Sequence, residues 1–234
     1  MKTSVKKKNF YKVKDLSNSQ FELGYIYDNK FKNYNKSFYY YRKAAINGHD
    51  EAQCFVGHMY HKGHGVKRNK KKALKWYTKS ALQNNALAQF NISEIYLKDK
   101  LLKNEDKTIY WLKKSAENGN AEAECNLGKM YEFGNSNIGK DINKALNLYE
   151  KSAKKGCRPA QYNLGMIYFE GLIVNKNILI SLYWLKKAAH QGDASSKEYI
   201  DNIELNYNSY YDKKAEEIAK VYIHNTDINI MNII

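Results

Sequence analysis

The stretch AQYNLGMIYFEG at residues 160–171 has two close counterparts, AECNLGKMYEFG at 123–134 and AQCFVGHMYHKG at 52–63. Each copy begins with alanine and has glycine, tyrosine and glycine at its sixth, ninth and twelfth positions. The copies at 123–134 and 160–171 begin 37 residues apart. Self-similarity at a period of this length is typical of stacked repeat proteins, so the stretch predicts a repeat fold.

The period extends well beyond these three phrases. A tyrosine of the phrase recurs at Tyr27, Tyr60, Tyr96, Tyr131 and Tyr168, and a later alanine recurs at Ala45, Ala81, Ala116, Ala153 and Ala189. The first tyrosine interval is 33 residues and the later ones are 35 to 37. The sequence therefore predicts five repeats.

Each repeat has two apolar stripes at helical spacing. In the second repeat the first stripe consists of Ala52, Val56, Met59, Tyr60 and Gly63. The second stripe consists of Ala73, Leu74, Trp76, Tyr77 and Ala81. Such spacing places apolar side chains on one face of a helix, so each repeat is predicted to be a pair of helices.

The predicted helix ends carry the residues that helix ends require. A short polar residue stands before each second helix, at Asn33, Asn69, Asn104, Asp141 and Asn177. Such side chains accept hydrogen bonds from the free N–H groups of the first turn. After the second helices stand Gly48, Asn84, Gly119, Gly156 and Gly192, which suit a left-handed C′ position. Asn85, Asn120 and Asp193 are then predicted to cap the next helix.

These motifs resemble the Sel1-like repeat, a relative of the tetratricopeptide repeats. The resemblance rests on the pattern A-x-x-L-G-x-x-Y, a G-x-G-V loop and K-A-x-x-W-Y-x-K-A-A, and VGHMYHKGHGVKRNKKKALKWYTKSA shows it best. The third repeat departs from the pattern, because Ser93 replaces the helix glycine and LKDKLLKNEDKT lacks both loop glycines. The resemblance implies an all-α fold, a right-handed α-solenoid of antiparallel helix pairs.

The expected domain organisation follows the repeats. We expect a basic N-terminal tail over residues 1–16 and the Sel1-like solenoid over 17–206. A C-terminal capping helix over 207–224 and a tail over 225–234 complete the prediction. Terminal caps of this kind are expected of solenoids, whose last unit otherwise leaves an apolar face uncovered.

The composition excludes several classes of protein. No stretch reaches the roughly 18 apolar residues that span a bilayer, and no signal peptide is recognisable. The three cysteines have no disulfide-like spacing, which predicts reduced thiols in a cytoplasmic protein. The net charge of +15 is concentrated, because residues 1–14 and 67–75 hold twelve of the 39 basic residues and no acid. Elsewhere 27 basic residues face 24 acidic ones.

The first helices are predicted to line a concave groove. The groove residues expected from the repeat positions are Phe55, His58, Asn91, Glu94, Asn126, Lys129, Asn163 and Met166. Three successive repeats place asparagine at one position, and amides both donate and accept hydrogen bonds. The resemblance implies that this ladder holds the backbone of an extended peptide, with Lys98 or Lys129 as charge partners and Phe133 nearby. The alternative is that the amides only tie adjacent helices together.

A basic patch forms the second candidate site. It consists of Lys67, Arg68, Lys70, Lys71, Lys72 and Lys75. If Asn69 caps the helix, Lys70 to Lys72 lie in its first turn, where the helix dipole disfavours cations by about 0.3–1 kcal/mol each. Stability alone would therefore not favour them, whereas a phosphate or an acidic partner would. The alternative is a solvated, lysine-rich surface.

Signals for metal binding and catalysis are weak. Cys54, His58 and His61 have a spacing that could ligate zinc, but no fourth ligand is evident. GHGV at 63–66 follows no predicted strand, so it is a turn rather than a phosphate loop. No nucleophile–base set stands out, so no catalytic residue, metal or cofactor is predicted.

The sequence thus predicts a non-catalytic scaffold or adaptor of the cytoplasm. It would bind a peptide segment or a protein partner in the groove, and no binding to a membrane is predicted. The alternative is a protein that binds nucleic acid or an acidic partner through the lysine-rich runs 1–14 and 67–75. The oligomeric state is not predicted.

Overall fold

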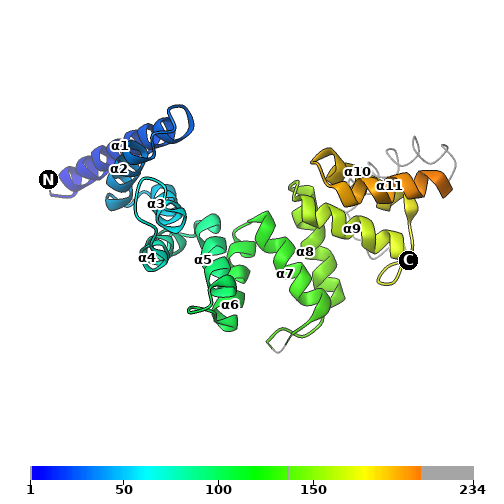
Figure 1. Cartoon of the computed structure of the whole chain (residues 1–234). Helices are drawn as coiled ribbons and strands as arrows, with labels where there is room; N and C mark the ends of the chain where they lie inside the picture. Colours follow the sequence, from blue (N-terminus) through cyan, green and yellow to red (C-terminus); the bar gives the residue numbers. More distant parts are fainter. Residues whose placement is uncertain (1, 136, 207–234) are drawn as a thin grey trace. The chain divides into compact units, whose positions relative to one another are not determined.

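The computed structural model describes residues 2–135 and 137–206, and the described part is entirely α-helical in its regular structure (Figure 1). Its eleven helices are α1 (Lys2–Asn29), α2 (Tyr34–Ile46), α3 (Asp50–Lys62), α4 (Lys70–Ala81), α5 (Ala86–Lys98), α6 (Glu105–Glu117), α7 (Ala121–Phe133), α8 (Ile142–Lys154), α9 (Arg158–Glu170), α10 (Ile178–His190) and α11 (Ala194–Asn206). The predicted all-α solenoid of helix pairs is confirmed. None of the helices in the described ranges is long and apolar enough to cross a membrane.

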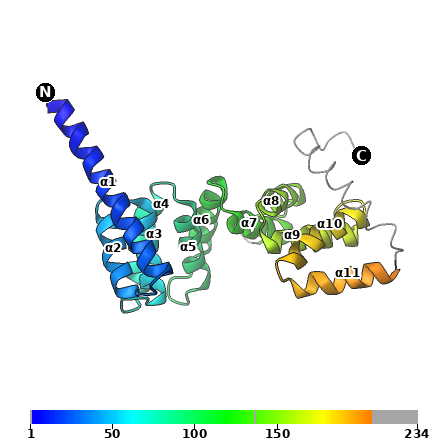
Figure 2. The same cartoon turned by 90° about the horizontal axis from the view of Figure 1, so that it is seen from above.

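The helices pack in chain order within two compact units. The first unit, Met1–Ala123, contains α1 to α6. In it α1 packs on α2, α3 on α4 and α5 on α6, while α2 contacts α3 and α4 contacts α5 (Figure 2). The second unit begins at Glu124, and there α9 packs on α8 and α10, and α10 packs on α11.

The predicted caps are confirmed at the second helices. The side chains of Asn33, Asn69, Asn104, Asp141 and Asn177 each accept a hydrogen bond from the backbone N–H three residues later. The predicted left-handed positions are confirmed as well: φ is positive at Gly48, Asn84, Gly119, Gly156 and Gly192. Asn85, Asn120 and Asp193 also cap the next helices, as predicted.

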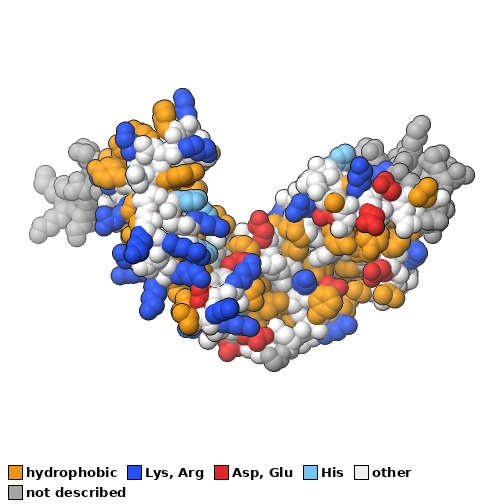
Figure 3. All heavy atoms as spheres, viewed as in Figure 1, with side chains coloured by type: hydrophobic (Ala, Val, Ile, Leu, Met, Phe, Trp, Pro, Cys, Tyr) orange, Lys and Arg blue, Asp and Glu red, His pale blue; other side chains and the backbone are white. Residues whose placement is uncertain are grey.

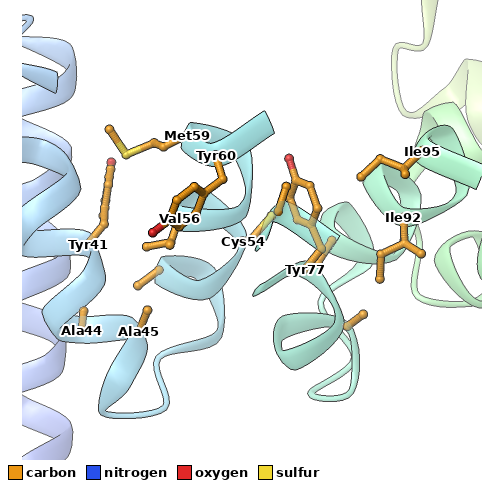
Figure 4. Close-up of a cluster of buried hydrophobic side chains, with 14 residues drawn as sticks. Tyr41, Ala44, Ala45, Cys54, Val56, Met59, Tyr60, Tyr77, Ile92 and Ile95 are labelled. Carbon is orange, nitrogen blue, oxygen red and sulfur yellow. The ribbon is translucent and has the colours of Figure 1, made fainter. Parts of the chain in front are cut away.

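Part of the core of the first unit lies between consecutive repeats. Tyr41, Ala44 and Ala45 of α2 face Val56 and Met59 of α3 in a cluster of buried side chains (Figure 4). The small alanines let the two helices approach closely, so that the larger side chains interlock around them. Apolar side chains are therefore buried between consecutive repeats as well as within each helix pair.

Close approach also explains the glycine within the first helices. A Cβ atom on Gly57 would lie 2.7 Å from Cδ1 of Tyr77. The third repeat has Ser93 at this position, and its hydroxyl donates to the carbonyl of Phe90 at 2.7 Å within the same helix. The departure of the third repeat from the pattern therefore leaves its helix pair intact.

Polar contacts between repeats recur with the same period. Gln53, Gln89 and Gln161 each donate to the carbonyl oxygen of the alanine near the end of the preceding second helix, at 3.0–3.1 Å. Each also accepts a hydrogen bond at 2.8–2.9 Å from an amide that follows its own repeat's second helix. These buried amides fix the register of one repeat on the next.

Two terminal predictions differ from the structure or lie beyond it. Residues 1–16 were expected to form a tail, whereas α1 begins at Lys2 and continues to Asn29. The first helix of the solenoid thus extends through that basic segment. The predicted capping helix at 207–224 and the tail at 225–234 lie outside the described residues.

Candidate functional site

The predicted groove residues lie on the first helices of four repeats. Phe55 and His58 lie on α3, Asn91 and Glu94 on α5, Asn126 and Lys129 on α7, and Asn163 and Met166 on α9. The first four belong to the first compact unit and the last four to the second. The candidate groove is therefore described in two halves.

In the first half, an asparagine of the ladder reaches the preceding repeat. The amide of Asn91 on α5 hydrogen-bonds the sulfur of Cys54 on α3, which links the first helices of the second and third repeats. Burial raises the pKa of the Cys54 thiol from 9.0 to about 12, although the bond from Asn91 opposes the shift. Cys54 is thus a neutral buried thiol, and Asn91 has a role in tying the two repeats together.

Phe55 and His58 are only half-buried, and both have aromatic neighbours. The ring of Phe55 stacks on that of Tyr41, with the centroids 4.8 Å apart. The ring of His58 lies 6.0 Å from that of His64. Burial lowers the pKa of His58, and the neighbouring His64 lowers it further. A largely neutral imidazole is therefore presented at this point of the surface.

Glu94 and Lys98 form an ion pair on one side of α5, four residues apart. The Lys98 side chain is 70% exposed and that of Glu94 is 19% exposed. The sequence predicted Lys98 as a partner for a peptide carboxylate. Any such contact would compete with Glu94 for the ammonium group.

In the second half, the ladder residue Asn163 belongs to a polar network on Tyr149. The hydroxyl of Tyr149 donates to Oε2 of Glu132 at 2.6 Å. The Asn163 side chain hydrogen-bonds the same hydroxyl. Burial raises the pKa of Tyr149, and Glu132 raises it further. Three helices, α7, α8 and α9, are thereby joined at one phenol.

The other groove residues of this half differ in exposure. Met166 is half-buried and packs against a cluster that contains Leu182, Leu185 and Ile203. Asn126 is half-buried, and Lys129 is exposed. Lys129 is therefore the member of the predicted set in this unit that is most available to an acidic group.

The basic patch has structural partners that the sequence reasoning did not foresee. Lys70 forms an ion pair with Asp99, which also accepts backbone hydrogen bonds in the loop before α6. The ammonium of Lys72 lies 5.5 Å from the ring centroid of Tyr60. The expectation that stability would not favour first-turn lysines is therefore corrected for Lys70 and Lys72.

The contact of Lys72 is a property of the repeat. Lysines at the same position lie over the equivalent tyrosine at 5.1–5.5 Å in four repeats, as Lys36 on Tyr27, Lys72 on Tyr60, Lys107 on Tyr96 and Lys144 on Tyr131. Cation–π contacts of this kind contribute about 0.5–1 kcal/mol at exposed sites, which offsets the unfavourable dipole. These lysines therefore stabilise the helix pair.

The remainder of the patch is exposed. Lys67, Arg68, Lys71 and Lys75 all face solvent. Figure 3 shows Lys and Arg side chains gathered over α4 on the face in view. The segment 52–93 carries eight Lys or Arg residues and no Asp or Glu. Within the segment no acid offsets these charges, although Asp99 from outside it pairs with Lys70.

The structure provides no set of zinc ligands around Cys54, His58 and His61 in the part of the chain that it describes. Among the described residues, no group of three or more His, Cys, Asp or Glu side chains is placed to hold a metal ion. The Cys54 thiol is hydrogen-bonded by Asn91. His61 is half-buried, and burial is the main cause that lowers the pKa of its imidazole.

Sequence reasoning missed two polar residues, Glu132 and Asp99. Neither repeats with the period, and each finds its partner on another element, so no local pattern distinguishes it. A signal was present for the stacking residues, because glutamine recurs at positions 53, 89 and 161.

The comparisons with known proteins agree with this architecture. The family model described as the Sel1 repeat matches residues 17–49, 50–85, 86–120, 121–157 and 158–193. A Sel1 repeat protein from Oxalobacter formigenes has a similar structure, with a TM-score of 0.68 and 27% identity, over 73% of this chain and 49% of that one. A protective antigen of uropathogenic Escherichia coli strains, which displays an SLR fold, has a TM-score of 0.75 and 29% identity over 93% of this chain and 50% of that one.

The chain spans about half the length of these two proteins. An immunity protein from Pseudomonas aeruginosa shares the fold, with a TM-score of 0.55 and 22% identity over 77% of this chain and 67% of that one. The family model covers five consecutive copies of the repeat and well over half of the residues. The chain therefore belongs to the Sel1 repeat family.

Proposed function

We propose that this protein is a non-catalytic scaffold that binds a peptide segment or a protein partner on the surface of its first helices. Sel1 repeat proteins are generally protein-interaction scaffolds, which supports the general class. The partner and the surface are our inference from the residues of this chain.

One observation carries the proposal. Positions that stack the repeats keep the same chemistry, as in the buried alanines at 52, 88, 123 and 160. By contrast, the predicted groove position on the same helices differs in each of these repeats, as His58, Glu94, Lys129 and Met166. Side chains that only completed the stacking would resemble one another in the same way, because each would meet the same neighbours. The variable position is what a surface specific for one partner requires.

The asparagine ladder supports a peptide as the ligand. An amide side chain can make four hydrogen bonds, and one bond to Cys54 or Tyr149 leaves the others available. Asn91 and Asn163 are half-buried, so their amides are held by the packing while part of each remains accessible. Amides held in this way are suited to the backbone of an extended segment.

The test is affinity capture from native lysate at about 0.15 M salt with nuclease, where exposed charge pairs are partly screened. Wild type is compared with Asn91→Ala/Asn126→Ala/Asn163→Ala. A matched control, Asn35→Ala/Asn143→Ala/Asn147→Ala, makes the same chemical change at exposed positions of second helices. We expect a protein that is retained by the wild type and the control and lost by the ladder variant. Equal retention by all three folded proteins would contradict the proposal.

A second candidate function rests on the exposed part of the basic patch. Lys67, Arg68, Lys71 and Lys75 lie in a segment without acidic residues, which favours phosphate or carboxylate groups. Binding to nucleic acid would weaken steeply between about 50 and 200 mM salt, because counterions are released from the phosphates. Partners that disappear with nuclease and are unaffected by the ladder variant would favour this function.

A further inference from the structure

The solvent side of two second helices of the first unit, α2 and α4, is basic. Together these helices carry eight Lys or Arg residues and no Asp or Glu. Five of the exposed ones fall within an arc of about 100° around the helix axis when equivalent repeat positions are superimposed. They are Arg42, Lys43, Lys71, Lys75 and Lys79. The buried Tyr41 and Tyr77 lie on the opposite side of the two helices, so the five basic side chains point to solvent.

Contacts at both ends place α2 and α4 beside each other. His64, in the loop that leads to α4, stacks on Tyr34 at the start of α2, with the ring centroids 4.9 Å apart. Two residues after α4, the amide of Gln83 donates at 3.1 Å to the carbonyl oxygen of Gly48, which lies two residues after α2. The two helices therefore run parallel, and their basic sides adjoin.

The charge belongs to these two helices and is not a property of the repeat. Asp106 of α6 occupies the repeat position of Lys71, and Glu150 of α8 occupies that of Arg42. The packing of the repeats therefore requires no basic residue at either position. Among the described residues, the one ion pair made by the eight basic residues of α2 and α4 joins Lys70 to an acid, and Lys70 is not one of the five.

Aromatic rings accompany these charges. Tyr39 occupies the repeat position of Lys75 and is 52% exposed. The ammonium of Lys43 lies 4.5 Å from the ring centroid of Tyr39, and that of Lys79 lies 4.6 Å from the ring centroid of the half-buried Trp76. Aromatic rings for stacking bases, set among positive charges that follow the phosphates, are the combination by which proteins hold single-stranded nucleic acids. A carboxylate partner would use the ammonium groups and leave the Tyr39 ring without a contact.

We propose that Tyr39 and the five basic residues, which we call the α2–α4 surface, bind single-stranded nucleic acid. The proposal rests on the second candidate function, because it shares Lys71 and Lys75 with the basic patch, and it names the kind of nucleic acid. Lysines follow one another along α4 at intervals of four residues, or about 6 Å, so a strand that passes along α4 meets one at every turn. A base stacks on the Tyr39 ring, which a single strand permits because its bases can be turned outward.

The number of basic residues sets the expected dependence on salt. Each contact with a phosphate of a single strand contributes about 0.7 to the slope of log affinity against log salt. Four such contacts give a slope of about −3, so the affinity should fall about 50-fold between about 50 and 200 mM salt. Removal of two contacts should make the slope shallower by about 1.4.

The test is fluorescence anisotropy of the full chain with a labelled oligothymidylate of about 15 nucleotides, which is near the upper site size of a single binding module. Lys43→Gln/Lys79→Gln should bind more weakly and with the shallower slope. The matched control is Lys114→Gln/Lys151→Gln, which removes the same charges at the same repeat position of α6 and α8. Its slope should equal that of the wild type, because acids accompany the lysines on these two helices.

Tyrosine variants separate stacking from charge. Tyr39→Ser should bind about tenfold more weakly with the slope unchanged, whereas Tyr39→Phe keeps the ring and should stay within about twofold of the wild type. Tyr110→Ser is the control, because Tyr110 occupies the same position of α6 and is 55% exposed. Circular dichroism checks that each variant keeps its helices. An equal loss for Tyr39→Ser and Tyr110→Ser would overturn the assignment to the α2–α4 surface.

Two further probes complete the test. A duplex of the same length and a polyglutamate peptide should each bind at least about fivefold more weakly than the single strand, because neither offers a free base to Tyr39. Equal binding of the duplex, with no effect of Tyr39→Ser, would overturn the proposal and leave the second candidate function standing. A preference for polyglutamate would overturn it in favour of an acidic protein partner. Absence of binding to both nucleic acids would overturn the proposal together with nucleic-acid binding by the basic patch.

Discussion

Removing one hydroxyl at equivalent positions of two repeats should change the stability of the protein by different amounts. Tyr77 and Tyr149 occupy the same position of the second helix, and both are fully buried. The Tyr149 hydroxyl donates to Glu132 at 2.6 Å and is bonded by Asn163. The Tyr77 hydroxyl is buried with no hydrogen-bond partner among the described residues. Phenylalanine keeps the ring and the packing in both cases, so the substitution isolates the polar group.

The magnitudes follow from these partners. Hydrogen bonds to charged groups contribute about 1.5–3 kcal/mol. Glu132 is half-buried and can recover part of its hydration after the change, so Tyr149→Phe should cost about 1.5 kcal/mol, the lower end of that range. A buried hydroxyl without a partner contributes nothing to offset its own desolvation. Tyr77→Phe should therefore lie within about 0.5 kcal/mol of the wild type or stabilise the protein.

Urea unfolding followed by tryptophan fluorescence can measure both effects. Trp184 packs in the same cluster as Tyr149, and Trp76 packs against the cluster that contains Tyr77. The midpoint should fall for Tyr149→Phe with the slope unchanged, because the surface exposed on unfolding stays the same. Equal losses for the two variants would refute the reasoning, since they would show that hydroxyl partners do not distinguish the two sites.

Three further predictions concern the helix contacts, the buried thiol and the basic patch. Gly57→Ala should destabilise the protein by about 1–2 kcal/mol in a urea titration, because the new methyl group would displace the Tyr77 ring and overpacking outweighs the gain in helix propensity. Between pH 9 and 12 the Cys54 thiol ionises in the unfolded chain but not in the folded one, so the unfolding free energy should fall as pH rises through this range. Cys54→Ala should show a smaller fall than the wild type between pH 8 and 10.5. Lys71→Ala/Lys75→Ala should leave the thermal midpoint within error and reduce the retention on a heparin column, because both side chains are exposed.

The helix ends and the repeat period were predictable from the sequence. Asn69 accepts a hydrogen bond from the N–H of Lys72, and Gly48 adopts a positive φ, because the groups satisfied at a helix end lie within a few residues of the cap. Stacked repeats bury the same positions each time, so their alanines and glutamines recur at a fixed interval. Local chemistry and periodicity therefore determined the fold class and the family.

The pairing of individual polar side chains depended on the tertiary structure. Tyr60 and Lys72 are 12 residues apart, whereas Tyr27 and Lys36, which make the same contact, are 9 apart. The loops between the paired helices differ in length, so no constant spacing reveals the contact. The bond of Tyr149 to Glu132 likewise exists only after two helices pack. The sequence predicted a groove residue at Asn163, and the structure added its tie to that phenol.

The exposure of Leu23 and Ile26 on α1 was also decided by the tertiary structure. By periodicity Leu23 and Ile26 are core residues, because the same pattern is buried at Val56 and Met59. Burial of a stacking face requires a neighbouring repeat, and in the described chain α1 has one on a single side. The sequence by itself determined which helix faces are apolar, since periodicity is written along the chain. Only the packing of one repeat on the next decided which of those faces are covered.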